Sequence, residues 1–216
     1  MFQVVCVNVG QKFEPEYVHR LQRAVALNLK LPHDFAVVTD APQKYHCRTL
    51  PAMDNLKGYW QKVTLFAPER EEQYRGNRIL YLDLDTVVMG DISELVTHPA
   101  TFIALKDQLL PMINSSVMCW NFDEFRHVYA NFNPDEIPEW TRGDQEYTNS
   151  QVWATYAQEL FGEAQYPDFK ENLKHREPIS GEKLVWFHGV PHPHTLQWVQ
   201  DLWRKQKIEY QQRTGK

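Results

Sequence analysis

Short apolar runs alternate with segments of helical period at the start of the chain. Residues 2–9 are rich in β-branched side chains and predict a buried strand, and residues 35–40 predict a second one. Between them, residues 16–29 carry apolar side chains three or four positions apart, which is the spacing of a helix. Because a strand, a helix and another strand form a right-handed crossover, we expect the two strands to be parallel neighbours or near neighbours.

A further apolar run, at residues 78–88, predicts the centre of the sheet. It is apolar on both faces, as is typical of a strand that is covered on both sides. A short strand at residues 47–50 and a helix at residues 60–66 precede it. The pair Gly90-Asp91 ends it, and a helical turn follows at residues 92–96.

The second half of the chain is less regular but still alternates strands and helices. We expect strands at residues 102–105, 116–120 and 183–188, and helices at residues 123–132, 144–161 and 195–207. The pattern predicts an α/β fold with a mostly parallel central sheet flanked by helices. It fits one domain over residues 1–210, followed by a polar tail at residues 211–216. In such sheets, ligands bind beyond the carboxyl ends of the strands.

Composition narrows the classes of function. The 216 residues are 43% hydrophobic, enough for one sizeable core, and the net charge of −5 offers no basic field to hold a polyanion. The chain starts in a strand-like run rather than a signal peptide, and no apolar segment approaches the roughly 18 to 20 residues that span a bilayer. Three widely spaced cysteines indicate neither a disulfide framework nor a zinc site. We therefore expect a soluble, cytoplasmic protein.

Two carboxylates, Asp83 and Asp85, interrupt the central apolar run ILYLDLDTVV. Burying an unpaired carboxylate costs several kcal/mol or forces it to take up a proton, so a positive group must lie nearby. If the backbone stays extended, both side chains point to the same side of the strand. They either form salt bridges with Lys or Arg, or bind a divalent cation, Mn²⁺ or Mg²⁺, that holds a diphosphate.

Several segments together resemble one enzyme family. The stretch YLDLDTVV at residues 81–88 resembles the DxD strand of the GT-A-fold nucleotide-sugar glycosyltransferases, in particular glycosyltransferase family 8, which includes glycogenin and bacterial galactosyl- and glucosyltransferases. Other segments resemble family motifs in the same order: residues 4–10, VTD at 38–40, GYWQK at 58–62, NSSVM at 114–118, GDQ at 143–145 and FHGVPHP at 187–193. The resemblance covers residues 3–194 and implies a single GT-A domain.

The resemblance also implies a metal site. Asp83, Asp85 and His188 match the cation ligands of the family, and one imidazole beside carboxylates suits Mn²⁺ better than Ca²⁺. A divalent cation stabilises the charge that develops on the diphosphate leaving group. Lys62 would add a second positive group near the diphosphate or the sugar. The plainer interpretations are an ordinary loop histidine for His188 and a helix-surface lysine for Lys62.

For the donor nucleotide, the resemblance favours UDP over GDP. Its base and ribose would meet residues at the ends of the predicted strands, namely Val7, Asn8, Gly10, Asp40 and Leu84. Asp40 also suits a simple turn before Ala41-Pro42. Gly189 and His192 belong to the late loop that would contact the phosphates. His192 stands where the family usually has Lys, which predicts weaker or pH-dependent phosphate binding because histidine is only partly protonated near neutrality.

On the sugar side, Asn114 and Ser115 would contact hydroxyl groups, and Asp144 and Gln145 would lie beneath the donor ring. The resemblance implies a retaining transfer of a hexose-type sugar. Either Asp144 or Gln145 acts directly, as nucleophile or electrostatic support, or the acceptor attacks from the same face with help from the leaving phosphate. We favour same-face attack, since no unambiguous nucleophile is visible. Asp144 also suits a helix cap.

Two other classes of function stay open at this point. A nucleotidyltransferase on a related fold is disfavoured because no Gly-rich, basic phosphate loop follows the first strand. A non-catalytic nucleotide-sugar-binding module would not need the complete set of metal ligands. The acceptor is open between a glycan, a lipid-linked sugar, a protein and a modified nucleic acid. The last helix either packs on the sheet or pairs with a second copy in a homo-oligomer.

Overall fold

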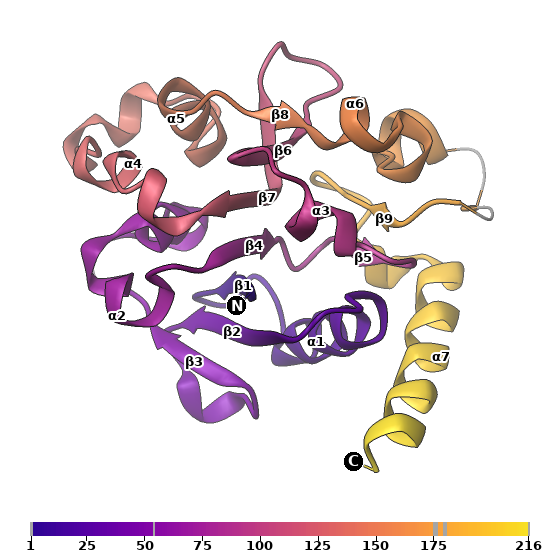
Figure 1. Cartoon of the computed structure of the whole chain (residues 1–216). Helices are drawn as coiled ribbons and strands as arrows, with labels where there is room; N and C mark the ends of the chain where they lie inside the picture. The colour runs from indigo at the N-terminus through magenta and orange to yellow at the C-terminus, as the bar shows by residue number, and fades with distance from the viewer. Residues whose placement is uncertain (1, 54, 175–176, 179–180, 216) are drawn as a thin grey trace.

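The computed structural model describes residues 2–53, 55–174, 177–178 and 181–215 and centres on a seven-stranded sheet (Figure 1). The strand order is β3-β2-β1-β4-β7-β6-β8. The strands are β1 (Phe2–Asn8), β2 (His33–Thr39), β3 (Arg48–Pro51), β4 (Arg78–Leu82), β6 (Phe102–Lys106), β7 (Ile113–Asn121) and β8 (Thr155–Tyr156). Neighbours are parallel except β4 with β7 and β7 with β6. This confirms the predicted α/β fold with a mostly parallel sheet flanked by helices.

The predicted strand at residues 78–88 is wrong in one respect, because it is two strands rather than one. β4 ends at Leu82, and β5 (Val87–Val88) pairs antiparallel with β9 (Leu184–Val185) in a separate small sheet. A turn joins β4 to β5: the backbone N–H of Thr86 donates to the carbonyl of Asp83 at 3.1 Å. The turn moves both aspartates to the edge of the sheet, where Asp83 is partly exposed and Asp85 stays buried. Strand alternation therefore does not decide where Asp83 and Asp85 point.

Two long helices, α1 (Pro15–Asn28) and α7 (Gln197–Thr214), pack together on one face of the sheet (Figure 1). Val18, Leu21 and Val25 of α1 and Val199 and Trp203 of α7 are buried in the same apolar cluster. The last helix was predicted to end at residue 207, but it continues to Thr214. The polar residues 211–214 are therefore helical.

Shorter helices surround the rest of the sheet. They are α2 (Glu71–Tyr74), α3 (Ser93–Thr97), α4 (His127–Ala130), α5 (Asp144–Gln151) and α6 (Ala157–Phe161). The helix predicted at residues 60–66 is a 3-10 helix, Gly58–Phe66, and a π-helical segment forms at Phe169–Leu173. The helix predicted at residues 144–161 is wrong as a single element. Val152 is extended, with ψ of 150°, and β8 then pairs with β6 before α6 begins.

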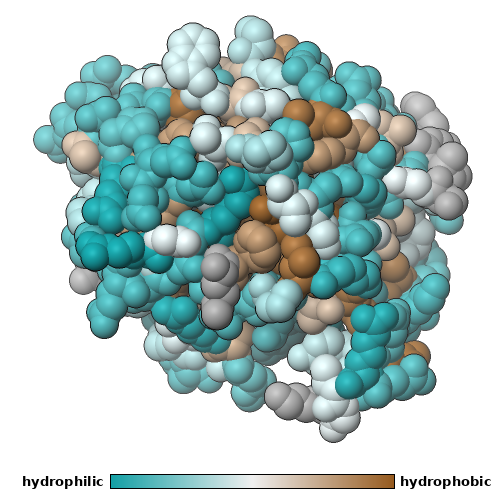
Figure 2. Space-filling view, in the orientation of Figure 1, coloured by the Kyte–Doolittle hydropathy of each residue, from teal (hydrophilic) through white to brown (hydrophobic). Residues whose placement is uncertain are grey.

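The sheet separates two apolar clusters. One contains α1, α7 and the small sheet, and the other contains the 3-10 helix Gly58–Phe66 together with side chains of α4 and α5. In the same orientation, Figure 2 shows a largely hydrophilic surface with a few apolar side chains grouped near its centre. Within the described residues, no helix is both long enough and apolar enough to cross a membrane.

Candidate active site

A cleft of about 450 Å³ opens at the carboxyl ends of β1 and β4 and the adjacent start of β7. Most of the residues that the sequence singled out line it: Val7, Asn8, Lys62, Asp83, Leu84, Asp85, Asn114, Ser115, Asp144, Gln145, His188 and Gly189. These residues are far apart in the chain. Val7, Asn8 and Asp83 meet because parallel strands bring their carboxyl ends to one edge of the sheet, and the other residues reach that edge from β7, from helices and from loops.

Three residues from the sequence analysis do not line this cleft. The backbone N–H of Gly10 donates to Asp40 Oδ2 at 3.0 Å, so these two residues fasten the end of β1 to the end of β2. His192 lines a second cavity, between α1 and α7. The donor contacts predicted for Gly10, Asp40 and His192 stay predictions.

Lys62 is the centre of the ionic network in the cleft. It is only 5% exposed, so it is not a helix-surface lysine. Its Nζ lies 3.1 Å from the carboxylate of Asp83, 3.4 Å from Asp144 Oδ2 and 3.1 Å from Ser115 Oγ. Burial acts to lower the pKa of Lys62, but the charges of Asp144 and Asp83 outweigh it and raise that pKa above its usual value. The lysine is therefore a permanent cation between two carboxylates.

Asp144 is the first residue of α5 and points into this network rather than capping the helix. Gly143 is the N-cap residue, and no side chain makes a capping hydrogen bond there. Asp144 Oδ2 accepts a hydrogen bond from Ser115 Oγ at 2.8 Å. Burial raises the pKa of Asp144, while Lys62 opposes the rise. Gly143 has a φ of 69°, and a Cβ atom at this position would lie 2.7 Å from the ring of Tyr59.

The two aspartates of the DxD motif have different surroundings. Asp83 is held by Lys62 and accepts a hydrogen bond from the hydroxyl of Tyr81. Asp85 is 7% exposed and, among the described residues, forms no ion pair or hydrogen bond with another side chain. Burial, reinforced by the charge of Asp83, raises the pKa of Asp85 to about 7. A buried carboxylate of this kind lacks a cation in contact with it, which fits a site for a divalent metal ion.

His188 follows β9, lines the cleft and contacts a buried carboxylate through its Nδ1. Its Nδ1 lies 2.9 Å from Asp168 Oδ2, and Asp168 is fully buried at the start of the segment Phe169–Leu173. This contact favours the tautomer with a proton on Nδ1 and leaves the lone pair on Nε2. Within the described residues, however, no three His, Cys, Asp or Glu side chains form a preassembled metal site. Asp83, Asp85 and His188 share one cleft without forming a closed ligand set.

The sugar-side candidates form a second hydrogen-bonded group. Gln145 Oε1 accepts from the backbone N–H of Ser115 at 3.3 Å, and its Nε2 donates to Asp107 Oδ2 at 3.1 Å. Asn114 Oδ1 accepts from the N–H of Ser116 at 3.0 Å. Asp107 and Asp168 were not predicted from the sequence. Neither stands in a recognisable motif, so their partners become visible only in three dimensions.

Comparison with solved structures places the fold among glycosyltransferases. The glycosyltransferase GlyE of Streptococcus pneumoniae TIGR4 superposes with a TM-score of 0.68 at 12% identity, over 94% of this chain and 59% of GlyE. The galactosyltransferase LgtC, solved with donor and acceptor sugar analogues, superposes with a TM-score of 0.64 at 12% identity, over 95% of both chains. The chain thus spans about three fifths of the length of GlyE but nearly all of LgtC.

Neither a protein-family model nor a curated protein matches the sequence. The identity to the solved structures is low, so the likeness concerns the fold. The chain has the GT-A-type fold that its sequence motifs predicted, and it resembles the structures of the glycosyltransferases GlyE and LgtC.

Proposed function

We propose that the protein is a metal-dependent, retaining glycosyltransferase that moves a hexose-type sugar from a UDP-sugar to an acceptor hydroxyl. One observation carries the proposal: Asp83, Asp85, Lys62 and Asp144, from three separate elements, meet in one cleft at the carboxyl edge of the sheet. The likeness of this fold to those of the glycosyltransferases GlyE and LgtC supports the same activity.

The donor set of the cleft fits a divalent cation, Mn²⁺ or Mg²⁺. Asp83 and Asp85 would hold the cation, and Nε2 of His188 would join them with oxygens of a diphosphate. When bound, such a cation stabilises the negative charge that develops on the leaving diphosphate. Lys62 fixes Asp83 and Asp144 in position through its contacts with both. It also adds positive charge at the same end of the cleft.

The surroundings of Asp144 favour same-face attack over a covalent intermediate. Its Oδ2 already accepts from Ser115 and faces Lys62, and both contacts lower the nucleophilicity of a carboxylate. Gln145 is likewise engaged with Asp107 and the backbone of Ser115. These two residues are therefore suited to orient donor hydroxyls, while the acceptor proton passes to the leaving phosphate.

Thermal denaturation with nucleotides and metal tests the donor assignment. Mn²⁺ together with UDP should raise the melting temperature more than either alone, and more than Mn²⁺ with GDP or dTDP, because a ligand that binds only the native state stabilises it. Asp85→Ala should remove the Mn²⁺-dependent part. Glu72→Ala, which removes an exposed carboxylate, should behave like the wild type. Stabilisation by another nucleotide and none by UDP would show that the donor is assigned wrongly.

Slow hydrolysis of UDP-sugars tests the metal-dependent chemistry itself. Asp83→Ala and Asp85→Ala should each reduce the hydrolysis rate by on the order of a hundredfold, comparable to the loss of a major electrostatic contact to the leaving group. Release of UDP is measured in a coupled assay with and without chelator. Hydrolysis at the wild-type rate in both variants would rule out this mechanism.

A further inference from the structure

Two positively charged side chains are unpaired in the cleft that is proposed to bind the donor (the donor cleft). The lining of this cleft includes three Lys or Arg side chains, Lys12, Lys62 and Arg142. Lys62 is already engaged with Asp83 and Asp144. In the part of the chain that the structure describes, the Lys12 ammonium and the Arg142 guanidinium form no ion pair and no hydrogen bond. Both groups are therefore free to bind an anionic ligand.

The balance of charge in the cleft changes when a donor binds. A divalent cation would balance the carboxylates of Asp83 and Asp85, and Lys62 already lies against Asp144. The diphosphate of a nucleotide sugar then adds negative charge that these contacts do not balance, and a charge held in a cleft without a partner is costly. The unpaired cations of the cleft are the groups that remain to meet it.

Lys12 and Arg142 lie on different sides of the donor cleft. Lys12 belongs to the segment between β1 and α1, next to Val7 and Asn8, where the nucleotide is expected. Arg142 directly precedes Gly143 and Asp144, on the side where the donor sugar is expected. The charge of Lys12 also reaches the metal-binding side of the cleft. It opposes the rise in the pKa of Asp85, and its effect is larger than that of Lys62.

The segment that carries Lys12 is fastened at several points. The backbone N–H of Gly10 donates to Asp40 Oδ2 at 3.0 Å, and Nδ2 of Asn8 donates to the carbonyl of Phe13 at 3.3 Å. Lys12 Nζ lies 4.9 Å from the centre of the Phe13 ring, a cation–π contact that restrains a long side chain. Lys12 is exposed, but its backbone and its ammonium are both held beside the cleft.

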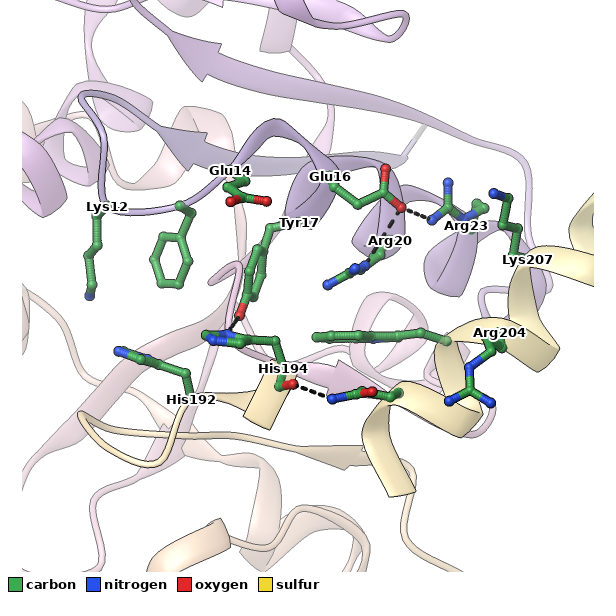
Figure 3. A pocket seen from close by; sticks show the side chains of 13 residues that line it. Lys12, Glu14, Glu16, Tyr17, Arg20, Arg23, His192, His194, Arg204 and Lys207 are labelled. Atoms are coloured by element: carbon green, nitrogen blue, oxygen red, sulfur yellow. Dashed lines mark hydrogen bonds and ion pairs between the residues drawn. The ribbon is translucent and has the colours of Figure 1, made fainter. Parts of the chain in front are cut away.

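His192, which the sequence predicted near the phosphates, has different surroundings. Its ring packs edge-on against the ring of Phe13, with centroids 6.4 Å apart, and stacks on the ring of His194 at 5.8 Å. Figure 3 shows these two histidines in the cavity between α1 and α7, where the His194 ring also meets the hydroxyl of Tyr17. Lys12 lines both the cavity and the donor cleft, whereas His192 lines the cavity and not the cleft.

We propose that Lys12 binds the diphosphate of the donor and provides the positive charge that the sequence analysis assigned to His192. This inference rests on the proposed glycosyltransferase function. The Lys12 ammonium would donate hydrogen bonds to diphosphate oxygens from the nucleotide side, as lysine does in many phosphate sites. The cation at Asp83 and Asp85 would bind the same diphosphate from the edge of the sheet. Positive charge on both sides stabilises the diphosphate as it leaves.

Calorimetry of UDP binding in the presence of Mn²⁺ tests this assignment without turnover. Lys12→Gln should weaken UDP binding about tenfold, the typical effect of losing one charge-assisted hydrogen bond. Uridine, measured by competition against UDP, carries no phosphate and should bind the variant and the wild type equally well. An equal loss for uridine and UDP would show that Lys12 acts on the nucleoside or on the shape of the loop, and would overturn the proposal.

Matched variants separate a specific contact from a general effect of charge. Arg142→Gln removes one positive charge from the other side of the same cleft and should leave UDP binding unchanged. Lys12→Arg keeps the charge and should retain most of the affinity. His192→Gln, which tests the competing assignment, should weaken UDP binding less than Lys12→Gln does. Equal losses in Lys12→Gln and Arg142→Gln, or a larger loss in His192→Gln, would overturn the proposal.

The wild type separates this inference from the function on which it rests. If the wild type with Mn²⁺ did not bind UDP, the proposed donor would be wrong and the role of Lys12 would be wrong with it. UDP binding that Lys12→Gln does not change would leave the proposed function in place and overturn only the role of Lys12. Without ligand, the Lys12 and Arg142 variants should melt at the wild-type temperature, because both side chains are exposed and unpaired among the described residues.

Discussion

At the scale of single residues, the buried carboxylate of Asp85 lowers the stability of the metal-free protein at a position proposed to bind a metal ion. Its folded-state pKa of about 7 lies above the ordinary value of 3.8. Well below the ordinary pKa of 3.8 the group is protonated in both states. As the pH rises to 7, the unfolded chain releases this proton and the native chain keeps it, so the free energy of unfolding falls, and the loss is complete above the folded pKa. This is the cost of a buried carboxylate that has no cation in contact with it.

We therefore predict that Asp85→Asn stabilises the metal-free protein in a pH-dependent way. Because Asn does not titrate, the difference in unfolding free energy between variant and wild type should grow in favour of the variant between pH 5 and 8, by on the order of 2 kcal/mol. Urea denaturation in the presence of EDTA measures it. Glu72→Gln, at an exposed carboxylate, is the control and should show no such trend. A difference that is constant with pH would contradict the assigned titration.

The site residues that were predicted from the sequence lie in local sequence patterns, whereas those that were not predicted are defined by contacts between residues far apart in the chain. Asp83, Asp85 and Lys62 stand in recognisable local patterns, so their chemistry was visible in the sequence. Asp168 and Asp107 join the site through contacts with side chains 20 and 38 positions away, namely those of His188 and Gln145. Such contacts depend on how loops pack against the sheet, and the spacing of hydrophobic residues along the sequence does not predict this packing.

At the scale of elements, the sequence predicted strands well where both faces are buried and poorly where the chain turns. β1 and β2 were predicted to within two residues at each end because their apolar runs are unbroken. The break between β4 and β5 was missed because Thr86, Val87 and Val88 continue an apolar pattern after the aspartates. The interruption of the helix after α5 depends on pairing of β8 with β6, a tertiary contact that overrides local helical preference.

Asp168, the N-cap residue of the segment Phe169–Leu173, contacts His188, and we predict that Asp168 is a positioning residue. Asp168→Asn keeps the size and an oxygen that can accept from Lys170 N–H, but loses the charge that faces Nδ1 of His188. Mn²⁺ affinity, measured by calorimetry, should fall about 10- to 100-fold, as is typical for partners that orient a metal ligand. ¹⁵N spectra of the histidine ring should show a less defined tautomer. If affinity and tautomer were both unchanged, Asp168 would have only a structural role.

At the scale of the whole molecule, the cleft lies where the parallel and antiparallel parts of the sheet meet. β1 brings Val7 and Asn8, β4 leads into the turn that carries Asp83 and Asp85, and β7 runs antiparallel to β4 and brings Asn114 and Ser115 to the same edge. β9 pairs with β5, which follows the turn that carries Asp83 and Asp85, and this pairing brings His188 to the same edge from a distant part of the sequence. The cavity between α1 and α7 adjoins this cleft at Lys12 and Phe13.

This arrangement predicts the stereochemical outcome of transfer. Asp144 faces Lys62 and Ser115, so we expect no glycosyl-enzyme at this carboxylate and attack by the acceptor on the same face as the departing diphosphate. A UDP-α-sugar should give an α-linked product, which the anomeric coupling constant in a proton NMR spectrum measures. Asp144→Asn should slow transfer but leave the α configuration unchanged. A β-linked product from the wild type would exclude retention, and a covalent sugar adduct at Asp144 in the mass spectrum of intact protein would replace same-face attack by the two-step route.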